Sequence, residues 1–302
     1  MTGTDLADHV ALVTGATDGI GRATAVRLAR RGATVLVHGR DEAKARAVVE
    51  AVRSASDPAD GRSYRADFAD RAAVRDLAER VRADHDGLDL LVNNAGTWQG
   101  NHRRAAGWDD VEYTVAVNHL APFLLTNLLA PALVERAPAR VVTVSSGLHT
   151  RGDVSDLEAL FFPATFDARG AYADSKLANV LFAVELADRL AGTAVASHAV
   201  HPGTIPSTSL ARDTGGLSRA VWTLMGLVPG LTASPADGAR AVEYAATGPD
   251  LADRSGCYVV DSGTREPAPA ARDAALRERL WERSAALSGC PPDGPAVDSP
   301  RS

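Results

Sequence analysis

The chain has 302 residues, of which 45% are hydrophobic and 23% charged, and its formal net charge is −6. The apolar content excludes a disordered chain, and the length suits one large domain or two small ones. The acidic balance argues against a dedicated nucleic-acid binder, because such a protein has a basic face. The two cysteines, Cys257 and Cys290, exclude a disulfide scaffold and a multi-cysteine metal cluster.

The first residues and the hydropathy of the chain bear on its location. Residues 1–9 contain acidic side chains and no apolar run, unlike a signal peptide. No stretch approaches the ~20 uninterrupted apolar residues that span a bilayer. We therefore expect a soluble, cytoplasmic protein without a transmembrane segment and without a nucleic-acid partner.

Short runs rich in Val and Leu alternate with longer helical patterns along the chain. The runs are apolar at consecutive positions, which is typical of strands covered by helices on both faces. Strands are predicted at 10–14, 34–38, 62–66, 88–92, 140–145 and 195–201, and helices at 21–31, 41–53, 71–84, 109–135 and 172–190. This alternation predicts an α/β fold with a doubly wound, mostly parallel, Rossmann-type sheet in a single domain over 1–290.

Two segments interrupt the alternation, at 147–170 and at 206–234. Both contain large apolar side chains, with three phenylalanines in the first and Trp222 in the second. They are interpreted either as flaps over a hydrophobic substrate or as segments that pack on the body or form an oligomer contact. A last strand near Cys257–Val260 and a C-terminal helix follow, and the Pro-rich tail 291–302 is expected to be disordered.

A glycine-rich turn follows the first predicted strand and opens a helix. Its sequence from Thr14 to Gly21 has the spacing Gly-x3-Gly-x-Gly. Glycines there allow a pyrophosphate to approach closely, and the helix N-terminus presents free N–H groups and a positive dipole to it. A strand–turn–helix of this kind predicts a dinucleotide site, although such turns also serve only to pack a helix on a sheet. The candidate cofactor-binding residues of the turn are Gly15, Thr17, Asp18, Gly19, Ile20 and Gly21.

The end of the second predicted strand discriminates between NAD and NADP. An acidic residue there binds the adenosine ribose of NAD, whereas a basic residue suits the 2′-phosphate of NADP. Here Gly39 stands where the carboxylate would be, and Arg40 can bind a phosphate. The alternative is that Arg40 simply begins the next helix, facing solvent. The pattern favours NADP, with NAD as the weaker candidate.

With the later motifs added, the chain resembles a short-chain dehydrogenase/reductase along nearly its whole length. The motifs follow in order: the glycine turn, Asp67 after the third strand, the sequence Asn-Asn-Ala-Gly over 93–96, and then Asn118, Ser146 and Tyr172-x3-Lys176. The resemblance implies an adenine contact at Asp67, beside Phe68. It implies that Asn94, Ala95 and Gly96 border the cofactor, and that the nicotinamide amide is contacted by Pro202, Gly203 and Thr204.

Tyr172 and Lys176 stand at i and i+4, so that both project from one face of a helix. A phenol with a pKa near ~10 is a poor acid or base at neutral pH. A neighbouring ammonium and a positively charged nicotinamide favour the phenolate, so we expect a lowered pKa for Tyr172. Tyr172 can then exchange a proton with a carbonyl oxygen. Both residues are expected to line the cofactor, with Lys176 on the nicotinamide ribose.

The family pattern assigns roles to two further residues. Ser146 would orient the substrate oxygen, with Ser145 as the fallback, and Asn118 would anchor a water that relays protons toward Lys176. The separate alternatives are a turn residue for Ser146, a packing residue for Tyr172 and a solvated charge for Lys176. These alternatives leave unexplained why all three gather at the edge of the sheet where ligands bind.

The separation between Ser146 and Tyr172 is about twice the family's usual one. The extra segment, 149–170, resembles that of retinol dehydrogenase-like members. We therefore expect an NADP-dependent oxidoreductase that acts on a hydrophobic ketone, aldehyde or secondary alcohol, without a metal ion. An epimerase-type enzyme that uses the cofactor transiently and a catalytically silent NADP sensor are the alternatives. A homo-oligomer is possible, and the sequence names neither the substrate nor the direction.

Overall fold

The computed structural model describes residues 5–55, 60–203, 205 and 233–295. Eight strands form one sheet in the order β10-β9-β8-β7-β4-β1-β2-β3, and every neighbouring pair is parallel except β9 and β10. The strands are β1 (Val10–Val13), β2 (Thr34–Gly39), β3 (Gly61–Arg65), β4 (Leu90–Asn93), β7 (Ala139–Val144), β8 (Val195–His201), β9 (Cys257–Val260) and β10 (Gly263–Arg265). The α/β fold with a mostly parallel sheet is confirmed.

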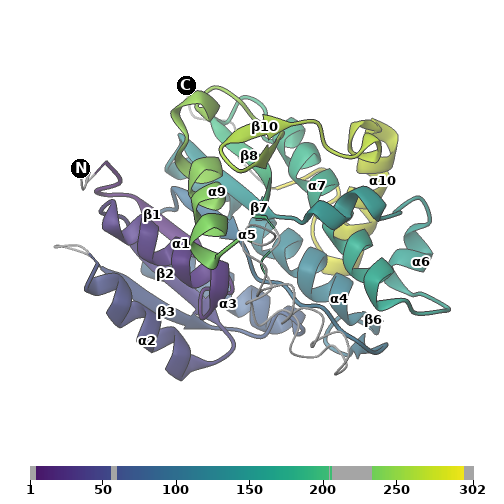
Figure 1. Ribbon diagram of the computed structural model, residues 1–302. Coiled ribbons are helices and arrows are strands. Elements are labelled where there is room, and N and C mark those ends of the chain that lie inside the picture. Colours follow the sequence, from purple (N-terminus) through teal and green to yellow (C-terminus); the bar gives the residue numbers. More distant parts are fainter. Residues whose placement is uncertain (1–4, 56–59, 204, 206–232, 296–302) are drawn as a thin grey trace.

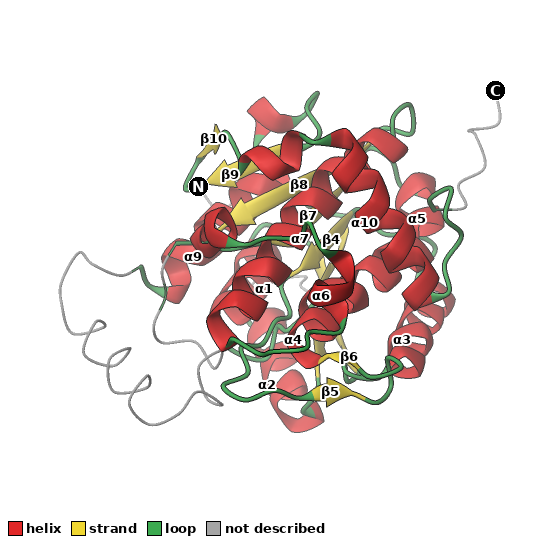
Figure 2. Ribbon diagram, turned by 90° about the vertical axis from the view of Figure 1, so that its right-hand side faces the viewer, coloured by secondary structure: helices red, strands yellow, loops and turns green. Residues whose placement is uncertain are grey.

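Helices cover both faces of this sheet. The first face carries α1 (Gly19–Arg30), α2 (Glu42–Arg53) and α9 (Pro235–Thr247) (Figure 1). The other face carries α3 (Arg71–Asp84), α5 (Ala121–Glu135), α7 (Ala168–Arg189) and α10 (Ala274–Ser288). Figure 2 shows α9, α1 and α2 on one side of the strands and α10, α5 and α3 on the other. Each face has its own buried apolar core, which explains why the strands are apolar at consecutive positions.

Three helices that follow strands begin at an aspartate. The carboxylates of Asp18, Asp41 and Asp70 accept a backbone N–H at the starts of α1, α2 and α3. Such capping satisfies a donor that has no partner within the helix. The boundaries of these helices are therefore encoded locally.

The chain reverses its direction of winding between β1 and β4. β1 pairs with β2 on one side and with β4 on the other, while β3 lies at the far edge. The connections that leave β1 and β4 therefore diverge at the C-terminal edge of the sheet. In open α/β sheets, ligands bind at such a point.

The predicted helix 109–135 is wrong at its start. Asp109 and Asp110 have positive φ angles of 53° and 65°, and a short hairpin joins β5 (Arg104–Ala105) to β6 (Val111–Glu112). Left-handed backbone cannot continue a right-handed helix, so the helical run begins only at α4 (Tyr113–Val115). A π-helical turn, Ala116–Leu120, joins α4 to α5.

The helical run from Tyr113 to Glu135 is long and apolar enough to cross a membrane. Its mean hydropathy reaches 1.4, and 78% of that stretch is buried inside the fold. It packs against α3 and α10 and contributes Phe123 and Leu124 to the core. Burial of this kind is typical of a core helix.

The segment 147–170 folds onto the body of the protein. It forms a 3₁₀ turn (Gly147–Arg151) and α6 (Leu157–Phe161), and Phe161 is fully buried in the core. The helix expected at 172 begins at Ala168, because Asp167 caps it. Of the segment 206–234, residues 206–232 lie outside the described residues. The tail is described up to residue 295, and the Pro292 carbonyl accepts a hydrogen bond from Arg189 (3.1 Å).

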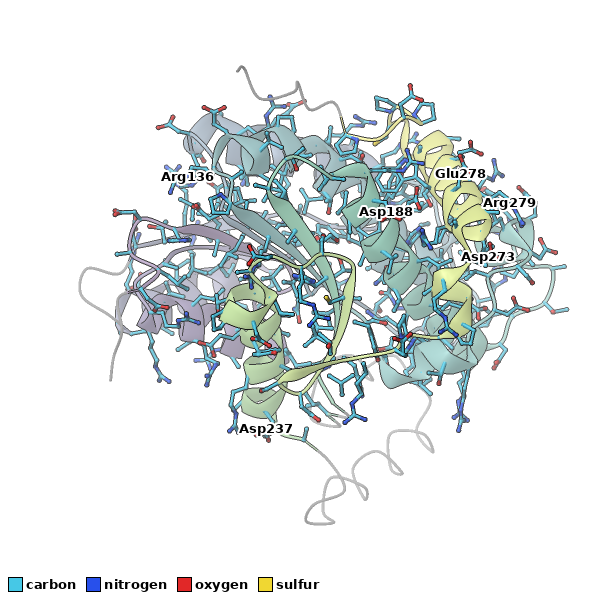
Figure 3. All side chains as sticks on the ribbon, turned by 90° about the horizontal axis from the view of Figure 1, so that it is seen from above. Arg136, Asp188, Asp237, Asp273, Glu278 and Arg279 are labelled. Atoms are coloured by element: carbon cyan, nitrogen blue, oxygen red, sulfur yellow. The ribbon has the colours of Figure 1, made fainter. Side chains whose placement is uncertain are left out.

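The C-terminal helix α10 covers α5 and α7. Trp281 is buried against Phe123 and Phe182, with ring centroids 4.7 and 5.9 Å away. Asp188, labelled in Figure 3, lies on α7 beside α10, and its carboxylate pairs with Arg277 (2.8 Å). The C-terminal helix therefore packs into the same apolar core as α5 and α7.

Candidate active site

The glycine turn after β1 packs directly on the loop after β4. Asn94 donates from Nδ2 to the Thr14 carbonyl (2.8 Å), and a Cβ at Gly21 would lie 2.4 Å from that same Nδ2. Gly15 has a φ of +62°, and a Cβ there would lie 2.7 Å from the Ala95 Cα. A side chain at either glycine would separate the two loops. Gly15, Gly21, Asn94 and Ala95 thus form one unit at the reversal point of the sheet.

The remaining residues of the turn surround the start of α1. Asp18 caps the helix, and Gly19 has a φ of +54°. Ile20 lies against Gly238 of α9, which also approaches the Pro202 carbonyl. The structure therefore brings Pro202 and Gly203, at the end of β8, to the same edge of the sheet as the turn. Thr204 lies outside the described residues.

His38 is a residue that sequence reasoning missed, and it lies at the end of the site where the sequence predicts the adenine. Its Nδ1 accepts the Gly15 N–H (3.3 Å), and its Nε2 donates to the Ala66 carbonyl (3.2 Å). Its ring stacks on Phe68, with centroids 4.4 Å apart. Burial lowers the pKa of His38 to about 4, so the ring is neutral at pH 7. Asp67 is exposed beside Phe68, and its carboxylate accepts the Ala69 N–H (3.0 Å).

Two arginines border the same end of the site. Arg40 is exposed directly after β2, and Arg65 ends β3 opposite Gly39 in the strand register. Arg65 donates from Nε to the Arg40 carbonyl (3.3 Å), so the two residues are adjacent. At Gly39 a Cβ would lie 2.3 Å from the Thr17 methyl group. A carboxylate side chain therefore has no room at position 39 unless Thr17 moves. Arg65 was not predicted, because its proximity depends on the pairing of β2 with β3.

Tyr172, Ser146 and Lys176 meet beyond the C-terminal ends of β7 and β8. Tyr172 is buried on α7, and its hydroxyl lies close enough to Ser146 for that side chain to influence its pKa. Burial raises the pKa of Tyr172 to about 12, and the Ser146 side chain lowers it in part. The expected lowering by Lys176 is wrong for the polypeptide by itself, because the Lys176 Nζ lies 5.7 Å from the ring centroid and desolvation outweighs its effect.

Lys176 is a buried cation. Among the described residues its Nζ donates to one acceptor, the Val144 carbonyl (3.0 Å), although an ammonium has three N–H donors. Burial lowers the pKa of Lys176 to about 8. A Cβ at Gly96 would lie 3.5 Å from this Nζ, so the glycine leaves space beside it. Buried donors facing such a space fit the hydroxyl groups of a ribose, and the site as a whole fits a nicotinamide dinucleotide.

Asn118 lies within the π-helical turn, behind the same space. Its Oδ1 accepts the Thr97 N–H (2.7 Å), and its Nδ2 donates to the Thr97 carbonyl and to Ser175 (both 3.0 Å). Asn118 therefore fixes the loop that follows Gly96. π-Helical turns are frequent at functional sites, because the extra residue redirects one side chain.

Two side chains of the loop after β4 stack on aromatic rings of other segments. The Trp98 indole stacks on the Tyr172 ring, with centroids 4.7 Å apart. His102 stacks on Phe166, which connects the loop after β4 to the segment 147–170. Sequence reasoning missed Trp98, although its place two residues after the Asn-Asn-Ala-Gly motif is a signal. Within the described part of the chain, no group of His, Cys, Asp and Glu side chains is arranged to hold a metal ion.

Residues 9–215 match the family model of short chain dehydrogenases. The chain belongs to the short-chain dehydrogenase/reductase family. It is 36% identical to human retinol dehydrogenase 13 over 280 residues, which cover 92% of this chain and 84% of that protein. It is 40% identical to mouse polyprenol dehydrogenase over 287 residues, which cover 93% and 84%. These relatives identify this short-chain dehydrogenase as a member of the retinol dehydrogenase-like subgroup.

Solved structures of the same family resemble this one. An uncharacterised protein of Mycobacterium paratuberculosis matches with a TM-score of 0.74 and 32% identity over 96% of this chain and 98% of that one. Pseudomonas aeruginosa RhlG, in its active-site complex with NADP, matches with a TM-score of 0.67 and 27% identity over 87% and 98%. This short-chain dehydrogenase is therefore a nicotinamide-dependent oxidoreductase that acts on alcohol or carbonyl groups.

Proposed function

We propose that this enzyme is an NADP-dependent carbonyl reductase for bulky apolar ketones and aldehydes, able also to oxidise the corresponding alcohols. Tyr172 is its general acid and base. The observation that carries the proposal is the buried Tyr172 phenol, whose pKa is influenced by the Ser146 side chain and whose ring lies 5.7 Å from the Lys176 ammonium. No packing role requires these three groups at the ligand-binding edge of the sheet.

The ionisation state of Tyr172 favours the direction of reduction. With a pKa raised by burial, its hydroxyl carries a proton at neutral pH and can donate it to a carbonyl oxygen. The reduced nicotinamide, when bound, supplies the hydride. Ser146 donates a hydrogen bond to the same oxygen and orients the carbonyl group. In alcohol oxidation, Tyr172 must first lose its proton, and burial disfavours the resulting phenolate.

Lys176 and Asn118 support this proton transfer. We assign Lys176 to the ribose hydroxyls of the cofactor, because its buried ammonium has N–H donors beyond the one used by Val144. Asn118 accepts the Thr97 N–H and donates to the Thr97 carbonyl, and so fixes the wall behind Lys176. A water bound in the space beside Gly96 would complete a relay from Lys176 to solvent.

Two features support NADP over NAD. Arg40 and Arg65 present two guanidinium groups at the strand ends where the adenosine 2′-phosphate is bound in this architecture. The Thr17 methyl group fills the position in which a side chain at residue 39 would begin, so the NAD-type carboxylate is sterically disfavoured. The complex of RhlG with NADP is consistent with this assignment.

The surroundings of Tyr172 support an apolar substrate. Trp98 stacks on the Tyr172 ring. Phe166 belongs to the segment 147–170, which contains the extra residues that resemble those of retinol dehydrogenase-like members. The names of the relatives, retinol dehydrogenase 13 and polyprenol dehydrogenase, describe long apolar alcohols. We therefore assign a hydrophobic, uncharged carbonyl compound to this site.

The test is NADPH oxidation, followed by absorbance at 340 nm, with all-trans-retinal, a polyprenal, 2-decanone and a charged 2-oxo acid. We expect turnover with the apolar compounds and little with the acid. Tyr172→Phe should abolish turnover and leave NADPH binding nearly intact, whereas Tyr244→Phe on α9 is a matched control. Binding of NADPH without turnover across the panel would instead support a sensor, and isomerisation without net NADPH oxidation would support an epimerase.

A further inference from the structure

His149 connects the candidate catalytic loop to the far edge of the sheet. It lies in the 3₁₀ turn that follows Ser146 and is only 1% exposed. Its Nδ1 lies 2.8 Å from the Ser146 carbonyl oxygen, and its Nε2 accepts the Ala268 N–H (3.2 Å). The Tyr258 hydroxyl lies 3.4 Å from Nδ1. A single imidazole thus joins the backbone of Ser146 to residues more than a hundred positions later.

His201 contacts the next peptide group from the opposite side. It ends β8, and its Nδ1 accepts the Gly147 N–H (3.1 Å). Its ring lies over Gly147, where a Cβ would come within 3.2 Å of Nε2. The two histidines therefore bind the Ser146–Gly147 peptide unit at its carbonyl oxygen and at its N–H group.

The hydrogen bonds determine the protonation of both rings. A backbone N–H can only donate, so the nitrogen that accepts it must carry a lone pair. His149 is therefore neutral with its proton on Nδ1, from which it donates to the Ser146 carbonyl. His201 is neutral with its proton on Nε2. Protonation of either ring would set an N–H group against a backbone N–H group.

We infer that His149 and His201 are positioning residues that hold the Ser146–Gly147 peptide, and through it the Ser146 hydroxyl, toward Tyr172. This inference rests on the proposed function, because it concerns the orientation of Ser146 in that site. Ser145, by contrast, is fixed by the sheet itself through Val200 and by the Lys176 carbonyl. Ser146 lies beyond β7 and outside its strand pairing, so the two imidazoles supply restraint that the strand does not.

The two rings also make this restraint sensitive to pH. Burial lowers the pKa of both histidines, and each charged ring would repel the other. The other titratable groups that face them are Tyr258 from β9 and Asp261 after β9, and the Asp261 carboxylate raises the pKa of His201 only in part. The contact is complete at neutral pH and is lost as the pH falls below the ordinary histidine value near ~6.5.

The first experiment reads the tautomers without any ligand. Nitrogen-15 NMR of the histidine rings in the full chain should show His149 neutral with its proton on Nδ1 and His201 neutral with its proton on Nε2. Single substitutions of each histidine assign the signals. The opposite tautomer at His149, or a charged ring at pH 7.5, would overturn the inference whatever the enzyme's activity.

The second experiment separates the two contacts of His149. His149→Asn keeps an N–H group near the position of Nδ1, whereas His149→Gln keeps an acceptor near Nε2 and loses the Ser146 contact. We expect His149→Gln to lower kcat about tenfold with little change in the KM for NADPH, and His149→Asn to retain most of the activity. His201→Asn, which keeps an acceptor for Gly147, should preserve kcat and shift the acid limb of kcat/KM to lower pH.

A double-mutant cycle with Ser146→Ala distinguishes a failure of the positioning role of His149 from a failure of the proposed role of Ser146. If His149 acts through Ser146, the loss caused by His149→Gln should nearly disappear in the Ser146→Ala background. An equal loss in both backgrounds would overturn the positioning role. Wild-type activity in Ser146→Ala alone would instead show that the proposed role of Ser146 is wrong. Thermal melts of each variant identify any that fails to fold.

Discussion

The indole ring of Trp98 lies flat on the phenol ring of Tyr172, with an interplanar angle of 11° and 4.7 Å between centroids. Trp98 follows the loop that Asn118 fixes at Thr97, so the position of the indole depends on the π-helical turn. The stack restrains the ring of Tyr172, which is the general acid of the proposed function, and places an apolar surface on one face of that ring. The loop after β4, the π-helical turn and α7 therefore all contribute to the position of the Tyr172 ring.

Replacing Trp98 therefore tests the wall beside Tyr172. An offset-stacked aromatic pair contributes about 1 kcal/mol beyond its buried area, so Trp98→Ala should lower kcat/KM for an apolar aldehyde roughly fivefold. Trp98→Phe keeps a stacked ring and should retain most of the activity. Steady-state kinetics with a separate NADPH titration provide the measurement. A loss of NADPH affinity in Trp98→Ala would place the indole in the cofactor site instead.

The two arginines at the ends of β2 and β3 should determine cofactor preference together. Arg40→Ala and Arg65→Ala should each raise the KM for NADPH about tenfold or more and leave the KM for NADH nearly unchanged, because only NADPH carries the 2′-phosphate. Arg46→Ala, an exposed arginine on α2 that pairs with Glu42, is the control. Equal effects on both cofactors would remove the two residues from the phosphate site.

Position 39 provides a second test of the proposed preference for NADP. Gly39→Asp places a carboxylate at the NAD-type position, but its Cβ would meet the Thr17 methyl group at 2.3 Å. The single variant should therefore lose thermal stability. Thr17→Ser/Gly39→Asp removes the methyl group, restores the melting temperature and shifts kcat/KM toward NADH. If the double variant is no more stable than the single one, the contact with Thr17 is not the cause.

His198 should make the protein sensitive to acid. It is fully buried in β8, and among the described residues neither ring nitrogen has a hydrogen-bond partner. Burial lowers its pKa to about 4, below the value near ~6.5 of an unfolded chain, so the unfolded state binds more protons between these pH values. The stability that depends on neutral His198 is complete above pH ~6.5 and is lost as the pH falls toward 4.

Removing this imidazole tests the assignment. His198→Leu eliminates two buried polar atoms without partners, so it should maintain or raise the melting temperature at pH 7 and reduce its decline between pH 6.5 and 4.5. His119→Leu is the comparison, because His119 is also buried but its Nε2 bonds Ser284 (2.8 Å), and that variant should be destabilised at pH 7. An unchanged acid decline in His198→Leu would assign the pH sensitivity to other groups.

Local sequence patterns predicted the sheet, the glycine turn and the pairing of Tyr172 with Lys176. These features depend on short-range rules: apolar runs form strands, Asp18 and Asp41 cap the helices that follow, and residues four apart share a helix face. The start of α4 was missed because the left-handed backbone at Asp109 and Asp110 has no distinct signal in this pattern. The order of the motifs along the chain was sufficient to predict the family, which the matched relatives confirm.

Length, composition and charge indicate an acidic chain of one or two domains and specify no chemistry. The sequence by itself predicted an α/β fold of the short-chain dehydrogenase/reductase family, with Tyr172 and Lys176 on one face of a helix. Only the tertiary structure decided which groups surround them: Trp98 on Tyr172, Arg65 beside Arg40, and His149 with His201 around Ser146. Those contacts join residues distant in sequence, so strand register and loop packing determine them. Burial also reversed the expected pKa shift of Tyr172, because desolvation depends on the whole fold.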